Sequence, residues 1–347
     1  MKRLFITGNG NIEILEVPDL VIEEYEVLVK TKACSICGGD IKLYKSAREK
    51  VRELDTPFPL GGHEWSGEIV EVGSKITDFR IGDRVARCFV NYCGFCINCR
   101  LGMPNFCIGI DHEEQSGGFA EFVKFYIPPV GGRGLYKIPE GISYEEAALA
   151  EPGTCAIGAV LKANVNPGDS VAVIGLGGLG QLITQRLSAY GSYTVGIDIN
   201  ENKLLRASKW CKYVINSSIE DPVEKVKEIT QGVGADIVFE VVGIENTWIQ
   251  AIEMLRMGGR LIMVGVFTEP TKRFILDRIF RKNITVIPSK GPSPLITPQG
   301  EPLIWRDLRD GVIKPSLIYD VFPLGKANEA FYKQAYGDVA KGVIKFD

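Results

Sequence analysis

Long apolar segments are absent from this sequence of 347 residues. The segment 1–17 begins with two basic residues, but its first apolar stretch, at 4–7, is too short for the core of a signal peptide. The run LIMVGVF at 261–267 has the length of a strand and falls far short of the roughly 20 residues that span a bilayer. We therefore expect a cytoplasmic protein without membrane-spanning segments.

The sequence also lacks a strong excess of charge. Its 40 Lys and Arg residues and 43 Asp and Glu residues give a formal net charge of -3 and are interspersed along the chain. No basic stripe is available for a phosphate backbone or for an anionic membrane surface. We therefore expect neither a nucleic-acid partner nor a membrane partner.

Internal repeats and low-complexity tracts are missing as well, and the length predicts two domains because it exceeds what one core usually supports. Residues 1–150 show short strands and turns, including an expected hairpin over 4–17. Residues 151–289 alternate strand and helix, with helices expected over 180–189 and 201–211, which predicts an α/β fold with a doubly wound parallel sheet. The tail 290–347 ends in a helix and a strand that we expect to rejoin the first domain.

A glycine fingerprint follows the apolar strand SVAVI. Gly175, Gly177 and Gly180 give G-x-G-x-x-G at the start of an expected helix. These glycines allow a tight turn, a close approach of the backbone to a pyrophosphate and close packing of helix on strand, and the helix N-terminus attracts the phosphate charge. The pattern predicts a dinucleotide site rather than an ordinary glycine turn.

Asp198 ends the next strand, where a carboxylate can accept both ribose hydroxyls of NAD and would repel the 2'-phosphate of NADP. The alternative is an ordinary aspartate at a strand end. We predict NAD as cofactor and place its binding residues at Gly175, Leu176, Gly177, Gly178, Leu179, Gly180, Asp198 and Lys203.

Four of the nine cysteines lie close together in the sequence. Cys93, Cys96, Cys99 and Cys107 have the spacing C-x2-C-x2-C-x7-C. Four thiolates can close a tetrahedron around zinc and leave no position for a substrate. An iron–sulfur cluster is the main alternative, but the bacterial run has a shorter last gap and a proline after its last cysteine. We predict a structural zinc lobe over 93–107.

A second group of metal-ligand residues is spread along the chain. The sequence has two histidines, and His63 stands beside Glu64 in GGHEWSG, with Cys37 upstream and Glu151 downstream. A thiolate, an imidazole and one or two carboxylates can hold a catalytic zinc and keep a position for a substrate oxygen. Taken singly, Cys37 could be a buried small side chain and Glu151 a carboxylate at a helix start.

In this order, the motifs resemble the zinc-containing medium-chain dehydrogenase/reductase family over essentially the whole chain. The Glu-Pro pair at 151–152, where the alcohol dehydrogenases of that family usually have cysteine, is similar to the sorbitol, polyol, threonine and cyclitol branches. The resemblance implies a GroES-like β-barrel catalytic domain formed by 1–150 and 290–347, a Rossmann domain over 151–289 and an active site between them. It also implies a homodimer or homotetramer.

The resemblance assigns roles to individual residues. Cys37 and His63 would bind the catalytic zinc, Glu64 would be a ligand or a close alternate, and Glu151 would bind directly or through water. Asp40 would lie just behind the ligands, since a ligating imidazole commonly requires a carboxylate that fixes its tautomer, and Asp40 stands where family members carry one. With the lobe, the resemblance implies two zinc ions per chain.

One position departs from the family pattern. The family usually has Ser or Thr two residues after the zinc cysteine, where its hydroxyl passes on the substrate proton, but this chain has Gly39. Water, another hydroxyl or the substrate itself would have to replace it. His112 is a speculative substitute, and an exposed loop histidine is the more ordinary interpretation of that residue.

We expect hydride transfer between a secondary alcohol and nicotinamide, with zinc lowering the pKa of the alcohol. A polyol, cyclitol or sugar fits the Glu151 resemblance best, and L-threonine remains an alternative for which no carboxylate-binding residue can be assigned. A catalytically inactive, nucleotide-binding relative is the alternative from another class, with Gly39 as its symptom. Trp65 and Phe119 are candidates for the substrate pocket that the sequence does not distinguish from core residues.

Overall fold

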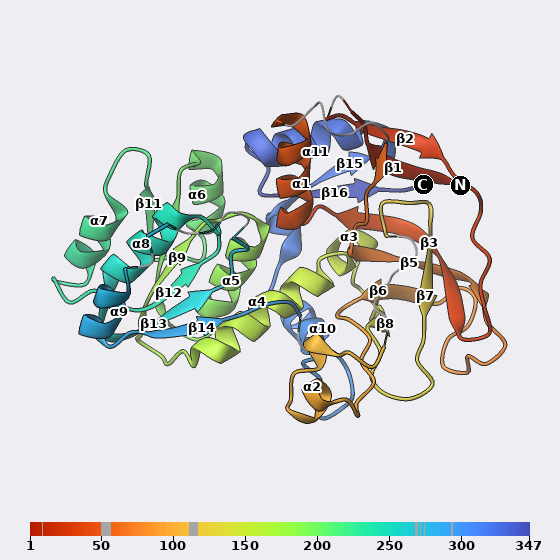
Figure 1. Cartoon of the computed structure of the whole chain (residues 1–347), viewed down its shortest axis with the longest axis horizontal. Helices are drawn as coiled ribbons and strands as arrows, with labels where there is room; N and C mark the ends of the chain where they lie inside the picture. Colours follow the sequence, from red (N-terminus) through yellow and green to blue (C-terminus); the bar gives the residue numbers. More distant parts are fainter. Residues whose placement is uncertain are drawn as a thin grey trace. The chain divides into compact units, whose positions relative to one another are not determined.

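The computed structural model describes residues 1–8, 10–49, 57–110, 117–267, 270, 272–273, 275–292 and 294–347. The chain divides into two compact units, shown in Figure 1. Unit 1 comprises Met1–Thr154, Pro292–Asp310 and Tyr319–Asp347, and unit 2 comprises Cys155–Gly291 and Gly311–Ile318. Each unit is built around its own hydrophobic cluster.

Unit 1 is rich in β-structure. A sheet with the order β15-β16-β3-β5-β6-β8, in which β7 also pairs with β3, lies beside the small sheet β2-β1-β4. The strands of unit 1 are β1 (Lys2–Ile6), β2 (Ile12–Glu16), β3 (Glu26–Ser35), β4 (Phe58–Pro59), β5 (Glu64–Val72), β6 (Arg84–Arg87), β7 (Phe122–Tyr126), β8 (Leu135–Lys137), β15 (Tyr319–Pro323) and β16 (Lys341–Lys345). Its helices are α1 (Gly38–Glu49), α2 (Ile97–Arg100), α3 (Tyr144–Ala147), α10 (Leu303–Arg309) and α11 (Ala327–Tyr336), and α4 (Ala150–Ala163) leads into unit 2.

Two expectations about unit 1 are confirmed. Strands β1 and β2 form the expected antiparallel hairpin, with Leu4 opposite Ile14. The C-terminal tail supplies helix α11 and strand β16, and β16 pairs with β3 through Val343 opposite Ser35. The end of the sequence therefore completes the sheet on which the N-terminal segment is built.

Unit 2 is a parallel sheet with the strand order β11-β10-β9-β12-β13-β14, flanked by helices (Figure 1). Chain order runs one way from β9 to β11 and the other way from β12 to β14, which is the doubly wound topology. The strands are β9 (Ser170–Ile174), β10 (Tyr193–Asp198), β11 (Tyr213–Asn216), β12 (Ala235–Glu240), β13 (Leu255–Met263) and β14 (Thr285–Pro288). The helices are α5 (Gly178–Ser188), α6 (Glu201–Ala207), α7 (Pro222–Ile229), α8 (Glu245–Met254) and α9 (Leu276–Lys282).

The helices of unit 2 begin and end where local chemistry directs. The Asn200 side chain caps α6 by accepting the amide of Lys203, and Asp221 caps α7 in the same way. Helix α6 is shorter than the expected helix over 201–211, because the chain turns after Ala207 and the Ser208 hydroxyl bonds back to the Leu205 carbonyl. Helix α5 occupies almost the expected range. Within the described part of the chain, no helix is both long and apolar enough to cross a membrane.

Candidate active site

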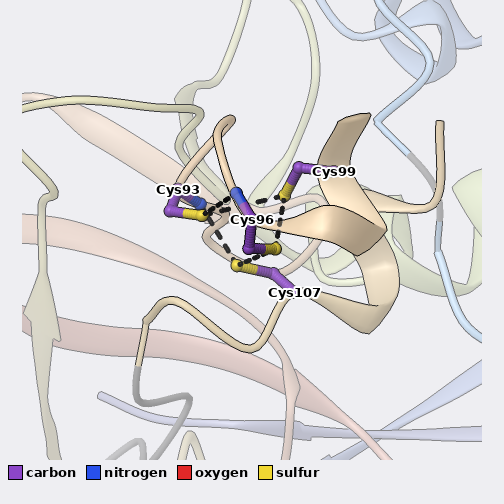
Figure 2. Close-up of side chains that lie close together, drawn as sticks. All are labelled: Cys93, Cys96, Cys99 and Cys107. Atoms are coloured by element: carbon purple, nitrogen blue, oxygen red, sulfur yellow. Dashed lines mark hydrogen bonds between the residues drawn. The ribbon is translucent and has the colours of Figure 1, made fainter. Parts of the chain in front are cut away.

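The four cysteines of the lobe gather around one point in unit 1 (Figure 2). Their sulfur atoms all lie within 4.8 Å of one another, and the Sγ atom of Cys96 is 3.5 Å from that of Cys99 and 4.0 Å from that of Cys107. All nine cysteines of the chain are free thiols. The lobe is therefore held together without a disulfide.

This arrangement suits a tetrahedral zinc ion. A zinc–sulfur distance of about 2.3 Å requires sulfur atoms about 3.8 Å apart, which matches the observed separations. Backbone amides point at the sulfurs, with the amide of Cys93 3.2 Å from Cys107 Sγ and that of Cys96 3.3 Å from Cys93 Sγ. Hydrogen bonds from the backbone of Ile108 and Cys99 lower the pKa of Cys96 to about 6. Cys96 is thus readily available as a thiolate, the form that binds metal, whereas burial raises the pKa of Cys99 to about 12.

A second group of ligand atoms lies elsewhere in unit 1. The ligand atoms of Cys37, His63 and Glu64 all lie within 4.8 Å of one another. Cys37 lies between β3 and α1, Glu64 is the first residue of β5, and His63 directly precedes it. Because β3 and β5 pair antiparallel with Ser35 opposite Glu64, the two segments meet at one end of the sheet. One sulfur, one nitrogen and one oxygen ligand suit a zinc ion that keeps an open position.

Burial raises the pKa of Cys37 and the charge of Glu64 adds to this, whereas its hydrogen bond to His63 and the charge of His63 oppose the shift. Burial disfavours the charged form of His63, but its hydrogen bond to Cys37 and the charges of Glu151 and Glu64 outweigh this and raise the pKa of His63 to about 10. Burial raises the pKa of Asp40 to about 6. The Asp40 carboxylate accepts the Cys37 amide at 2.9 Å and so fixes the turn that presents the sulfur.

Glu64 is anchored by two residues that sequence reasoning missed. Its carboxylate forms an ion pair with Lys341 and accepts the Ser35 hydroxyl, and Lys341 and Glu64 are 3% and 2% exposed. Lys341 lies at the start of β16, which β3 separates from β5. A lysine in the stretch AKGVIKF is ordinarily exposed, so the sequence carried no signal for this pair.

Glu151 lies in the first turn of α4 and is buried. It does not belong to the close group formed by Cys37, His63 and Glu64. Burial raises the pKa of Glu151, whereas the charges of His63, Arg87 and Lys341 oppose the shift. Arg87, at the end of β6, also donates to the His63 carbonyl at 3.1 Å. Glu151 is thus an electrostatic neighbour of the group.

Three further expectations concern the surroundings. Among the residues that the structure describes, a Cβ atom at Gly39 would meet only Cys37 Sγ, 3.9 Å away, which is an ordinary contact distance. Trp65 and Phe119 are fully buried and pack on Phe125 and Phe331, which makes them core residues. His112 falls outside the described residues.

The glycine fingerprint has the conformation that its sequence predicts. Gly175 has a φ of +95°, in the region that favours glycine. A Cβ atom at Gly180 would lie 1.9 Å from the Gly175 carbonyl oxygen, so only glycine lets α5 approach β9 this closely. Gly177 caps α5 without a side chain, leaving its first amides open to a phosphate. Leu176, Gly178 and Leu179 complete this turn.

Asp198 ends β10, directly beside this turn. Its two carboxylate oxygens accept the amides of Leu176 at 2.7 Å and Asn200 at 3.0 Å. A carboxylate offers about four acceptor positions, so it can also accept ribose hydroxyls. Lys203 lies in the first turn of α6, where its carbonyl accepts the Gln181 side chain at 3.2 Å.

Comparison with known proteins finds a family for each of two parts of the chain. Residues 23–139 match the family described as the alcohol dehydrogenase GroES-like domain, and residues 178–305 match the family described as zinc-binding dehydrogenase. A sorbitol dehydrogenase from Halalkalibacterium halodurans is 31% identical, with 99% of each chain aligned. An L-threonine 3-dehydrogenase from Bacillus velezensis is 32% identical over 82% of each chain.

A solved structure of an alcohol dehydrogenase has a similar fold over nearly the whole chain. The alcohol dehydrogenase from Thermus sp. ATN1 is 28% identical and aligns over 99% of both chains with a TM-score of 0.84. The expected fold, a GroES-like domain with a Rossmann-type parallel sheet, is confirmed. Two ligand groups, a nucleotide fingerprint and full-length relatives thus agree, and the chain belongs to the zinc-containing medium-chain dehydrogenase/reductase family.

Proposed function

We propose that this chain is an NAD-linked, zinc-dependent dehydrogenase that transfers hydride between a secondary alcohol carbon of a polyol, cyclitol or sugar and nicotinamide. The observation that carries the proposal is the open ligand group of Cys37, His63 and Glu64, in the same chain as a fingerprint with Asp198. The sorbitol dehydrogenase relative supports the substrate class. We propose zinc in both the lobe and the open group, about two ions per chain.

The chain's own residues prepare both half-reactions. When bound, zinc supplies a positive charge that lowers the pKa of an alcohol, and NAD accepts the hydride. Cys37, His63 and Glu64 would hold the metal, with Glu151 as the further carboxylate. Asp40 and Arg87 fix the backbone of Cys37 and His63, so the ligand atoms need little reorganisation.

The cofactor's adenosine half would be held in unit 2. The open amides at the start of α5 suit the pyrophosphate, and Asp198 suits the ribose hydroxyls. A phosphate on the ribose 2' oxygen would meet the Asp198 carboxylate and be repelled. This favours NAD over NADP.

Gly39 has no side-chain hydroxyl, so another group must carry the substrate proton out of the site. Among the described residues, a Cβ atom there would meet only Cys37 Sγ, so a water molecule has room beside Gly39. We propose that water performs this step. The variant Gly39→Ser should then keep its fold and its activity.

The test is direct. Zinc is quantified per chain, and nucleotide reduction is followed with polyols, cyclitols, aldoses, L-threonine and simple alcohols, with NAD and NADP in parallel. Turnover of a polyol, cyclitol or sugar with NAD supports the proposal, and turnover of L-threonine alone would favour the activity named for the Bacillus velezensis relative. Bound zinc without turnover on any compound would favour an inactive, nucleotide-binding relative.

A pair of matched variants ties the activity to the site. Glu151→Gln removes the buried carboxylate beside the ligand group, whereas Glu140→Gln makes the same change on an exposed residue of unit 1. The first variant should lose at least about tenfold in kcat/KM, since a charged group near the reacting oxygen is removed. The second should match the wild type. Equal activity of both variants would exclude Glu151 from the site.

A further inference from the structure

A buried carboxylate lies at the point where the strand order of unit 2 reverses. Strands β9 and β12 are neighbours there, and Glu240, the last residue of β12, pairs with Ile174, the residue before the first fingerprint glycine. Glu240 is 0% exposed. A buried carboxylate costs free energy unless it accepts several hydrogen bonds, so its partners indicate its purpose.

One oxygen of Glu240 collects three donors from the segment that follows β12. Its Oε1 atom accepts the amide of Val242 at 3.0 Å, the amide of Gly243 at 2.8 Å and the hydroxyl of Thr247 at 2.7 Å. Thr247 belongs to α8, so the side chain joins the strand end, the turn and the next helix. Hydrogen bonds to an ionised acceptor are stronger than those between neutral groups.

The same residue also holds the segment that follows β13. The Glu240 carbonyl accepts the amides of Val264 at 2.9 Å and Gly265 at 2.8 Å. A Cβ atom at Gly265 would lie 2.3 Å from the Gly243 amide and 2.7 Å from Glu240 Oε2, so the two segments touch with no room for a larger residue. Glu240 therefore fixes the carboxyl ends of β12 and β13 together.

The ends of β12 and β13 belong to one half of the sheet, and Asp198 belongs to the other half. Asp198 ends β10, on the other side of β9, and a dinucleotide binds across the reversal with one nucleotide on each half. The segments after β12 and β13 carry the exposed apolar side chains Ile244 and Val266, 49% and 66% exposed. Apolar surface beside polar backbone suits a flat heterocycle with a carboxamide.

We propose that Glu240 is a positioning residue for the nicotinamide half of the cofactor, which acts by holding the turns after β12 and β13 in their binding conformation. The inference rests on the proposed function and extends it. Glu240 itself has no contact with the cofactor in this proposal. Because Glu240 holds the turns in place before binding, less free energy is spent on ordering them when the cofactor binds. The affinity for the nicotinamide half therefore depends on Glu240.

The experiment compares two probes on the full-length, zinc-loaded protein. NADH requires both halves of the site, whereas 5'-AMP requires only the adenosine half, and both are titrated calorimetrically. The variants are Glu240→Gln, which keeps the shape and removes the charge, and Thr247→Val, which removes one donor. Thr247→Ser keeps the hydroxyl and is the matched control.

The expected pattern separates positioning from a general loss of structure. Glu240→Gln should weaken NADH about tenfold or more, and Thr247→Val less, while the affinity for 5'-AMP stays within about twofold of the wild type. Thr247→Ser should restore wild-type NADH affinity. Equal weakening of both probes, or unchanged NADH affinity in Glu240→Gln, overturns the inference. If the wild type bound neither NADH nor NADPH, the proposed function itself would fall.

Discussion

Replacing Lys341 by methionine leaves the Glu64 carboxylate buried without its ammonium partner. The two residues are 3% and 2% exposed, and the Ser35 hydroxyl remains as a donor. Removing one partner of a buried ion pair costs about 3–5 kcal/mol, because the remaining charge stays out of water. For a unit of this size, that corresponds to a melting temperature lowered by about 6–20 °C.

The assay is thermal unfolding of the metal-free protein, with a double-mutant cycle to isolate the pair. Glu64→Gln alone leaves Lys341 buried and unpaired, so it should also destabilise strongly. The double variant removes both charges and should be more stable than the sum of the single changes predicts. A Lys341→Met variant within about 1 kcal/mol of the wild type, or fully additive effects, would refute the reasoning.

Zinc provides an independent check on the same pair. If Glu64 lies against the metal as the ligand group indicates, the bound cation compensates the carboxylate that Lys341→Met leaves unpaired. The loss of stability should therefore be smaller with zinc than with a chelator. An equal loss of stability with zinc and with a chelator would show that Glu64 does not lie against the metal.

Three further predictions follow from single sites. Cys96→Ser should reduce zinc from about two ions to about one per chain in elemental analysis, since the lobe loses one of its four ligands; unchanged zinc would contradict the lobe. Burial raises the pKa of Asp236, but hydrogen bonds from Ser170 and Arg256 outweigh it and lower the pKa, so this residue stabilises the fold above its unfolded pKa of about 3.9 and loses that effect as the pH falls through its lower folded pKa. Asp236→Asn should therefore reduce stability at pH 7 in urea titrations, with the difference vanishing at acid pH; a constant difference would argue against it. Gly180→Ala should abolish NADH binding, because its Cβ would collide with a backbone carbonyl, and calorimetric binding at wild-type affinity would disprove the close approach.

Sites whose residues lie close together in the sequence could be predicted from the sequence. The four cysteines of the lobe fall within 93–107, so local turns alone bring their sulfurs together. The fingerprint joins a strand, a turn and a helix that are consecutive in the chain, and its glycines have the conformation that the pattern requires. Residue type was sufficient here because few backbone paths connect such neighbours.

The open ligand group could be predicted only in part. Cys37 and His63 come together because β3 and β5 pair in one register, which the motif order implied through a family resemblance rather than through geometry. Glu151 lies outside the close group, and Trp65 and Phe119 belong to the core. The type of a side chain does not show whether it lines a substrate pocket or packs in the hydrophobic core.

The sequence by itself determined which residues can bind metal and nucleotide. It also determined that the metal ligands and the nucleotide fingerprint lie in two successive parts of the chain. Tertiary structure decided the partners of the buried carboxylates: Lys341 pairs with Glu64 from a distant part of the sequence, and Glu240 accepts hydrogen bonds from the turn and helix that follow its strand. The physical reason is that burial makes an unpaired charge or hydrogen-bonding group costly, and burial depends on strand neighbours that are distant in sequence. Local pattern selects the chemistry, and long-range pairing sets its electrostatic environment.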